Sequence, residues 1–295
     1  FLSHLHDDYR KSLYRLRCFD ISAQMEVTDQ VLGDEFLLPC RRGRSIGEGT
    51  FASVHRAQLE GSGEVVAVKE LKLKLKLKDS SSTLFSAGAG AVARRRNEEE
   101  DDSIDVSKLK THLSMLRQVR HPRLGEMLGF RTALDSICII MEYVPGGSLQ
   151  KVLEEYGPLS APVVKKSARQ LLQGLDHLHM QRDPEIIHGD IKSSNVLVDL
   201  EFNMKLVDFG MTTYRPTAAL KSMQFVPWMA PEVLTGEGSL TKAADIYAFG
   251  CVVSEMVTGL KPWAHLYFRD ATEAVEFITS PDTSLQAPPG VGSFG

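Results

Sequence analysis

Apolar residues are spaced differently along the first and second parts of this chain. Residues 44–69 show a strand, a glycine-rich turn and a strand, and residues 127–150 show two further strands and a connector. Between these stretches, Ile104 to Val119 carries apolar residues at helical spacing. The other helical stretches are 158–180, with Val163, Leu171, Leu172, Leu175 and Leu178 as the expected buried stripe, 245–257 and 271–278. The pattern predicts mainly strands first and mainly helices afterwards.

Three stretches fall outside this regular pattern. Residues 1–35 predict a short amphipathic helix packed on the surface, with a partner-binding segment as the alternative. The strict alternation of Leu71 to Lys78 fits a half-exposed strand. Residues 79–103 run from small polar residues into Arg and Glu blocks that cannot bury enough apolar surface to order themselves. We expect a disordered insertion there, with a regulatory docking loop as the alternative.

Composition excludes several classes of protein. The chain has 295 residues, is 43% hydrophobic and carries a net charge of -4, which favours a globular protein without a basic surface for nucleic acid. No apolar run is long enough to span a membrane, and the first residues do not resemble a signal peptide. We expect a cytoplasmic protein and a segment of a longer chain. The four cysteines form no CxxC pair and suggest neither a zinc site nor a disulfide framework: Cys18, Cys40, Cys138 and Cys251.

Candidate chemistry is concentrated in residues 187–199 and 205–210. Short apolar runs there frame polar residues that a packed core would not select, namely Asp190, Lys192, Asn195 and Asp208. Phosphoryl transfer requires groups that orient a hydroxyl, hold metal ions and neutralise developing charge. These four residues have the types and the spacing for that chemistry, whereas a polar hairpin between two core strands is the structural alternative.

The same stretch resembles the catalytic-loop and Asp-Phe-Gly motifs of the eukaryotic protein kinase family. The resemblance implies that Asp190 accepts the proton of the substrate hydroxyl and that Lys192 stabilises the transferred phosphate. It further implies ATP and Mg²⁺ as cofactors, with Asn195 and Asp208 as the metal ligands. Lys192 is the form found in serine/threonine kinases, so the expected substrate is a protein with a Ser or Thr acceptor.

The resemblance also implies a nucleotide site. The glycine-rich turn would bring backbone N–H groups to the phosphates, and the following strand ends in Lys69, the catalytic lysine for the α- and β-phosphates. Ala52 stands where the family has its third glycine. The residues implied to contact the nucleotide are Ile46, Gly47, Gly49, Ala52, Val54, Ala67, Lys69, Met141, Glu142, Val144 and Leu197.

The implied architecture is an α+β, bilobal protein kinase fold. Its parts are an N-terminal extension at 1–39, a small β-rich N-lobe at 40–143 and a larger helical C-lobe at 144–295. The chain ends without the last helices of a kinase C-lobe, so we expect this lobe to be truncated. Asp245 is implied to hydrogen-bond the backbone of the catalytic loop. Candidate phosphorylation sites in the activation segment are Thr212, Thr213, Thr217 and Ser222.

Three positions depart from the family pattern. The helix glutamate that pairs with the strand lysine falls on His112, the arginine before the catalytic aspartate is Gly189, and a threonine of the docking region is Phe225. An acidic residue such as Asp105 could take the place of the missing glutamate. The favoured function is an active serine/threonine protein kinase in a signalling cascade, with upstream or scaffold proteins as partners. The alternatives are an ATP-binding pseudokinase scaffold and a phosphotransferase acting on a small molecule.

Overall fold

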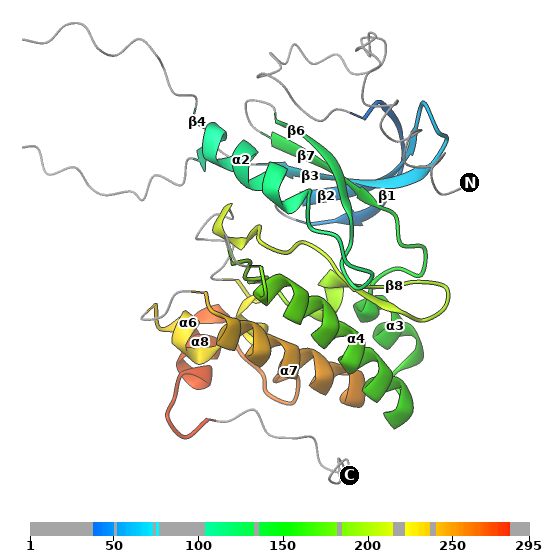
Figure 1. The fold of residues 1–295 in the computed structure, drawn as a ribbon. Helices are drawn as coiled ribbons and strands as arrows, with labels where there is room; N and C mark the ends of the chain where they lie inside the picture. The colour runs from blue at the N-terminus through cyan, green and yellow to red at the C-terminus, as the bar shows by residue number, and fades with distance from the viewer. Residues whose placement is uncertain are drawn as a thin grey trace, which may run out of the picture. The chain divides into compact units, whose positions relative to one another are not determined.

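The computed structural model describes residues 38–49, 52–72, 75–76, 104–132, 136–181, 185–214, 222–236 and 240–283 (Figure 1). The amphipathic helix expected in residues 1–35 and the insertion expected at 79–103 lie outside these residues. Part of the alternating stretch from Leu71 to Lys78 is described, as the end of one strand and as a short second strand at Leu75–Lys76.

The chain forms two compact units. One contains the residues up to Lys72 together with Leu128–Tyr143, and the other contains Leu73–Met127 and the residues from Val144 onward. The helix α2 (Val106–Leu116) therefore belongs to the second unit, although it lies between two segments of the first unit in the sequence. Each unit has its own hydrophobic core.

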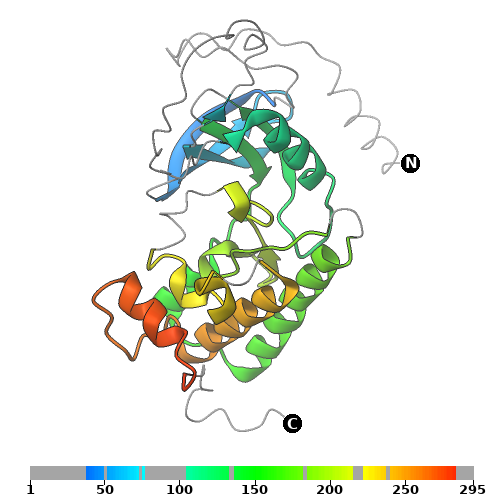
Figure 2. The ribbon, with the colours of Figure 1, turned by 90° about the vertical axis from the view of Figure 1, so that its left-hand side faces the viewer.

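The first unit is built on a five-stranded sheet with the strand order β1-β2-β3-β7-β6. Figure 2 shows the twist of this sheet, which is the usual right-handed twist of strands built from L-residues. The strands are β1 (Cys40–Glu48), β2 (Ala52–Leu59), β3 (Val65–Lys72), β6 (Met127–Thr132) and β7 (Ser136–Glu142). The sequence predicts two strands in residues 44–69 and two in residues 127–150; the structure has the latter two, but the first stretch contributes three strands, because β1 and β2 lie on either side of the glycine-rich turn.

The register of the sheet separates a core face from a second face. Val66 lies opposite Glu142 and Val68 lies opposite Ile140, and the core of this unit consists of Ala57, Val66 and Ile140 with partly buried apolar neighbours. Because side chains alternate along a strand, the residues between these positions point to the other face. That face carries Lys69, which lies opposite Val54 on β2 and Ile139 on β7.

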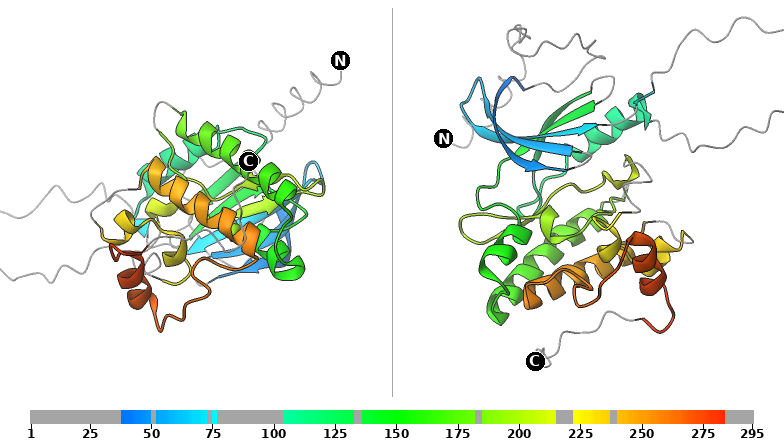
Figure 3. Two further views of the ribbon diagram at one scale, coloured as in Figure 1. Left: turned by 90° about the horizontal axis from the view of Figure 1, so that it is seen from below. Right: turned by 180° about the vertical axis from the view of Figure 1, so that it is seen from behind.

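The second unit is mainly helical. The helices α4 (Ala161–His179) and α7 (Lys242–Thr258) pack against each other along their lengths (Figure 3). The remaining helices are α2, α3 (Leu149–Tyr156), α6 (Pro231–Leu234), α8 (Ala271–Ile278) and the 3₁₀ turns η1 (Ser193–Asn195), η2 (Thr212–Tyr214) and η3 (Val226–Trp228). Two short sheets join them, β4 (Leu75–Lys76) with β5 (Ile104–Asp105) and β8 (Val196–Val198) with β9 (Met204–Leu206).

Polar side chains define where several of these helices begin. Ser148, Thr241 and Asp270 each accept a hydrogen bond from a backbone N–H of the first turn of α3, α7 and α8 respectively. Such caps satisfy donors that have no partner inside the helix. At its other end, α7 stops at Gly259, which adopts a left-handed conformation with φ 70°.

Two predictions about helices need correction. The helix expected from Ile104 starts at Val106, because Asp105 caps it and Ile104–Asp105 pairs with β4. On α4, Val164 is buried in place of Val163, and Leu172 is 41% exposed. The polar residues Ser167 and Gln170 complete the buried face, and Gln170 is there because it hydrogen-bonds Asn203 and the N–H of Met204. In the described part of the chain no helix is long and apolar enough to cross a membrane.

Candidate active site

The loop that carries Asp190 is held by a carboxylate of α7. The backbone N–H of His188 donates to Asp245 Oδ2 and that of Gly189 to Asp245 Oδ1, both at 2.8 Å. His179 Nε2 also lies 2.8 Å from Asp245 Oδ2, and since a carboxylate only accepts, this nitrogen carries the hydrogen. Asp245 is 2% exposed, so these three donors replace its solvation. The predicted contact between Asp245 and the loop backbone is present.

Three of the predicted catalytic side chains meet in this loop. Lys192 Nζ lies 3.0 Å from Asp190 Oδ1. Asn195 Nδ2 donates to Asp190 Oδ2 at 2.7 Å and to the carbonyl of Asp190 at 2.8 Å. Each carboxylate oxygen of Asp190 is thus held by at least one donor, which fixes the orientation of the group. The turn η1 sets the spacing, because the N–H of Asn195 closes it on the carbonyl of Lys192 at 2.9 Å.

Asp208 lies in a turn whose two sides are tied to the same loop. The N–H of Val207 donates to the carbonyl of Asn195 at 3.0 Å, and the N–H of Gly210 donates to the carbonyl of His188 at 3.2 Å. Asp208 itself has φ 65°, a left-handed conformation that costs free energy in a residue other than glycine. Strain of this kind is concentrated at functional sites, which fits the predicted metal-binding role of this carboxylate.

His188 is a buried neutral side chain between the acidic groups. Burial lowers its pKa, although the carboxylates of Asp245, Asp190 and Asp208 oppose this effect. Its Nδ1 accepts the N–H of Asp190 at 3.3 Å, so Nε2 carries the ring hydrogen. The ring also packs edge-on against Phe209 with 6.4 Å between centroids. His188 therefore links the loop to the Asp208 turn by packing.

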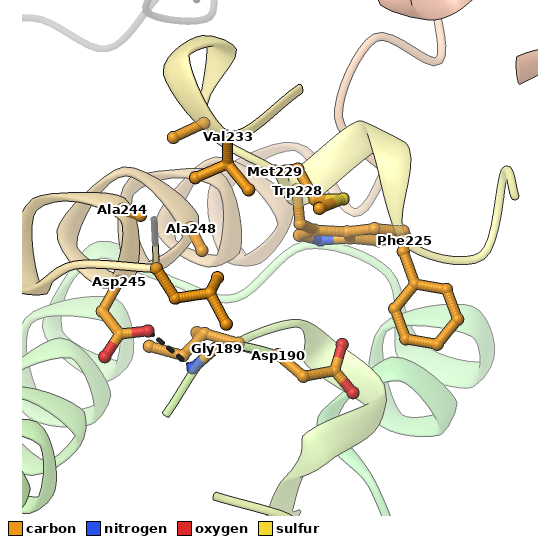
Figure 4. Close-up of a pocket in the computed structure, with 12 residues that line it drawn as sticks. Gly189, Asp190, Phe225, Trp228, Met229, Val233, Ala244, Asp245 and Ala248 are labelled. Atoms are coloured by element: carbon orange, nitrogen blue, oxygen red, sulfur yellow. Dashed lines mark hydrogen bonds between the residues drawn. The ribbon is translucent and has the colours of Figure 1, made fainter. Parts of the chain in front are cut away.

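An apolar pocket opens beside Asp190 (Figure 4). Phe225 and Trp228 form one part of its wall, and Gly189 and Asp190 lie at its floor in the view of Figure 4. The remaining lining residues are Ile191, Met229, Ala230, Val233, Leu240, Ala244, Asp245 and Ala248. Phe225 also covers Lys192, whose Nζ lies 3.8 Å from the centroid of the ring. The wall of the pocket and the catalytic loop are therefore in direct contact.

A second carboxylate of α7 joins this wall to the loop. Glu255 is 2% exposed and accepts from Ser193 Oγ at 2.6 Å and from Trp228 Nε1 at 2.8 Å. Burial raises the pKa of Glu255, while the two hydrogen bonds act in the opposite direction. The carbonyl of Pro227 accepts from Trp263 Nε1 at 3.2 Å. Residues 225–228 are thus held by hydrogen bonds to α7 and to the segment before α8.

In the first unit, the register gathers most of the predicted nucleotide residues on one face of the sheet. Lys69 lies opposite Val54, Ala67 lies opposite Met141, and Gly47 lies opposite Val54 from the other side. Ala52, two residues before Val54, shares this face. Gly49 lies in the turn, where its N–H donates to the carbonyl of Ala52 at 2.8 Å. By alternation Glu142 points to the core face, so only its backbone could meet an adenine edge, as the prediction has it.

Val144 and Leu197 belong to the second unit. A β-bridge joins Ser148 to Leu197, and the N–H of Val198 donates to the carbonyl of Gly147 at 2.8 Å. Val144 is buried, and Leu197 is half-buried. The segment after β7 therefore packs onto β8, the strand that follows the catalytic loop.

Comparison with known proteins identifies the family. A family model described as the protein kinase domain matches residues 87–287. The chain belongs to the protein kinase family. The matched range starts beyond Lys69, so the strand lysine of this kinase lies outside it.

The curated relatives of this kinase include proteins named mitogen-activated protein kinase kinase kinase. Mitogen-activated protein kinase kinase kinase ANP1 of Arabidopsis thaliana is 36% identical over 243 residues, which cover 81% of this chain and 33% of that protein. Mitogen-activated protein kinase kinase kinase 3 of Homo sapiens is 33% identical over 263 residues, which cover 86% of this chain and 37% of that protein. The chain thus spans about a third of the length of these relatives.

A solved structure supports the fold. The crystal structure of Rad53 1–466 in complex with AMP-PNP aligns with a TM-score of 0.58, at 22% identity, over 81% of this chain and 53% of that chain. Together with the family match, this confirms the predicted α+β protein kinase fold. The lobe boundaries and the roles of individual site residues stay predictions.

The structure shows what surrounds the departures from the kinase pattern. His112 Nε2 lies 2.8 Å from the carbonyl of Gly210. Asp105, the proposed substitute for the helix glutamate, uses Oδ1 to accept from the N–H groups of Ser107 and Lys108 at the start of α2. Gly189 has φ 74°, and a side chain there would meet Thr212 Oγ1 at 2.9 Å. An arginine at 189 would therefore require the side chains of Thr212 and Leu240 to shift.

Several residues of the kinase site escaped prediction. His179 is not among the predicted site residues, but it hydrogen-bonds Asp245, a partner 66 residues away in the sequence. Neither Glu255 nor Ser193 was assigned a role, although a lone glutamate in the apolar run of α7 is a detectable signal. Of the candidate phosphorylation sites, Thr212 is 3% exposed, Thr213 is exposed and Thr217 lies outside the described residues.

Proposed function

We propose that this kinase transfers the γ-phosphate of ATP to Ser or Thr hydroxyls of a protein substrate. The observation that carries the proposal is the arrangement of Asp190, Lys192 and Asn195. A carboxylate held by one ammonium and one amide, at the edge of a pocket, is suited to orient a hydroxyl. Asp190 is only 6% exposed and both of its carboxylate oxygens are held, which a polar hairpin on the surface would not require.

In this proposal each side chain of the loop has a defined task. Asp190 accepts the hydrogen of the substrate hydroxyl and receives its proton as the oxygen attacks phosphorus. Lys192 neutralises charge on the transferred group and is kept in place by Asp190, by the carbonyl of Gln224 at 3.4 Å and by the ring of Phe225. Asn195 fixes Asp190 through its amide nitrogen.

The residues present fit Mg²⁺. Asn195 uses Nδ2 for both hydrogen bonds to Asp190, which leaves Oδ1 as the atom that would bind a cation. Asp208 would supply a carboxylate. Mg²⁺ is bound by few protein oxygens when phosphates and waters complete its shell, and among the described residues no larger cluster of His, Cys, Asp and Glu could hold a metal. The bound ion would neutralise phosphate charge.

The nucleotide would use the face of the first unit that is not part of its core. Lys69 lies on that face together with the small residues Gly47, Ala52 and Ala67. Backbone N–H groups of a glycine-rich turn suit phosphate oxygens. We assign Lys69 to the phosphates and Val54, Ala67 and Met141 to the adenine, as the resemblance implies.

The substrate is proposed to be a mitogen-activated protein kinase kinase. This follows from the names of the relatives, which describe kinases one step further upstream.

Transfer of label from γ-³²P-ATP with Mg²⁺ tests the proposal. The substrates are a purified mitogen-activated protein kinase kinase and peptides that contain only Ser, only Thr or only Tyr as acceptor. We expect label on Ser or Thr. Asp190→Asn should lower kcat about 10² to 10⁴-fold with nucleotide binding retained, and Asp208→Asn should lose Mg²⁺-dependent nucleotide binding.

Asp176→Asn is the matched control, because Asp176 is an exposed carboxylate on α4 and should be replaceable without loss. Equal rates for Asp190→Asn and the unchanged protein would refute the assignment of the base. If the protein binds nucleotide but transfers no label to substrates that an active kinase labels, the proposed kinase activity is refuted. The alternative of a pseudokinase scaffold would then hold.

A further inference from the structure

His112 lies on the flank of the buried stripe of α2. The helix buries Val106, Leu109, Leu113 and Leu116, and this stripe fixes its rotation. Because side chains three and four residues apart share a helix face, His112 lies beside Leu109 and Leu116. The partial burial of its ring therefore follows from the position of this stripe.

The ring of His112 reaches the turn that carries Asp208. Nε2 lies 2.8 Å from the carbonyl oxygen of Gly210, and a carbonyl only accepts, so His112 is the donor. The other side of the ring packs on Tyr214 of η2, with 5.3 Å between centroids. The side chain thus contacts both ends of residues 210–214.

Gly210 links α2 to the catalytic loop. Its carbonyl accepts from His112, and its N–H donates to the carbonyl of His188 at 3.2 Å. The approach is close: Gly210 has φ 70°, and a Cβ there would meet Leu116 Cδ2 at 3.0 Å and His112 Nε2 at 3.3 Å. Both polar groups of this one residue, two positions after Asp208, are therefore fixed by neighbours.

We propose that His112 is a positioning residue for Asp208, and that it acts by donating a hydrogen bond to Gly210. The inference rests on the proposed function, in which Asp208 is a Mg²⁺ ligand. Family resemblance predicts a glutamate at this position, and that side chain would place a carboxylate against the carbonyl of Gly210. Two acceptors facing each other repel, so in this chain the glutamate is expected to impair the turn.

Deuterium exchange of the amides of residues 208–214, followed by mass spectrometry without Mg²⁺ or nucleotide, is the direct test. His112→Leu removes the donor and keeps an apolar side chain, and we expect exchange to accelerate about fivefold to thirtyfold. His112→Gln keeps an N–H donor and should restore exchange to within about threefold of the unchanged protein. Thr111→Ala, an exposed neighbour on α2, should leave it unchanged.

Phosphate transfer supplies the second readout. His112→Leu should raise the Mg²⁺ concentration for half-maximal transfer and lower kcat with little change in the KM of the protein substrate, and His112→Glu should be at least as impaired. Higher activity in His112→Glu, or unchanged exchange in His112→Leu, would overturn the inference. Absence of transfer in the unchanged protein would refute the proposed function instead, while the exchange result would still decide whether His112 holds the turn.

Discussion

Asp245→Asn is the substitution that tests most directly how the catalytic loop is held. Asp245 accepts from two backbone N–H groups, those of His188 and Gly189, and from the ring of His179. All three are donors, and the carboxylate is almost fully buried. An asparagine keeps the shape but has only one oxygen. Its NH₂ group must then face a donor, and the least costly choice turns it toward the N–H of Gly189.

The magnitude follows from these contacts. A buried donor without a partner costs about 1 to 3 kcal/mol, and hydrogen bonds to a charged acceptor are worth about 1 kcal/mol more than neutral ones. One orphaned N–H and two weakened bonds sum to about 3 to 5 kcal/mol of unfolding free energy. His179→Leu removes one donor and leaves the carboxylate with two, so it should cost about 1 to 2 kcal/mol.

Urea unfolding followed by tryptophan fluorescence measures this effect, because the chain has two tryptophans and both Trp228 and Trp263 are buried in the second unit. For a loss of this size the midpoint should fall by about 1 to 2 M for Asp245→Asn and by less for His179→Leu. Asp176→Asn is again the control. If Asp245→Asn and Asp176→Asn unfold at the same midpoint, the carboxylate does not hold the loop.

Two further residues give testable predictions, Glu255 through unfolding midpoints and Phe225 through phosphate transfer. Glu255→Gln keeps partners for Ser193 and Trp228, whereas Glu255→Ala should cost about 2 to 4 kcal/mol, and equal midpoints would contradict this. Burial raises the pKa of Glu255, so the folded state binds the proton of this carboxyl more tightly than the unfolded state does. The free energy of unfolding, measured relative to Glu255→Gln, should therefore fall as the pH rises from about 4.5 through the folded pKa. A difference between the two proteins that does not change with pH would contradict a raised pKa. Because the ring of Phe225 positions Lys192, Phe225→Leu should lower kcat about threefold to tenfold, whereas Phe225→Tyr keeps a ring and should not. An unchanged kcat in Phe225→Leu would show that the ring does not position Lys192.

Local patterns predicted most of the secondary structure. The two strands predicted in residues 127–150 are present, the stretch 44–69 contains three strands where two were predicted, and α8 covers the predicted residues 271–278. The exposed side chain of Leu172 shows where periodicity fails, because the rotation of α4 depends on what packs beside it. Polar residues such as Gln170 take part of the buried face when a strand end offers partners, and spacing alone does not reveal this.

The candidate site contains residues that the sequence predicts and residues that it does not. Asp190, Lys192 and Asn195 were found because they lie within six residues of one another and resemble a known motif. His179 and Glu255 were not assigned their roles, because their partners are 66, 62 and 27 residues away in the sequence. A polar residue whose role is to hold another residue has no local signature. Only the folded structure shows which groups such a residue holds.

The two carboxylates of α7 explain why this kinase can hold its loop and its pocket wall with glycine at 189. Asp245 and Glu255 lie ten residues apart, about 15 Å along a rigid helix. The first holds His188 and Gly189, and the second holds Ser193 and Trp228. The beginning and end of the catalytic loop are thus tied to one element, and Trp228 is tied to the same element without an arginine that binds a phosphate.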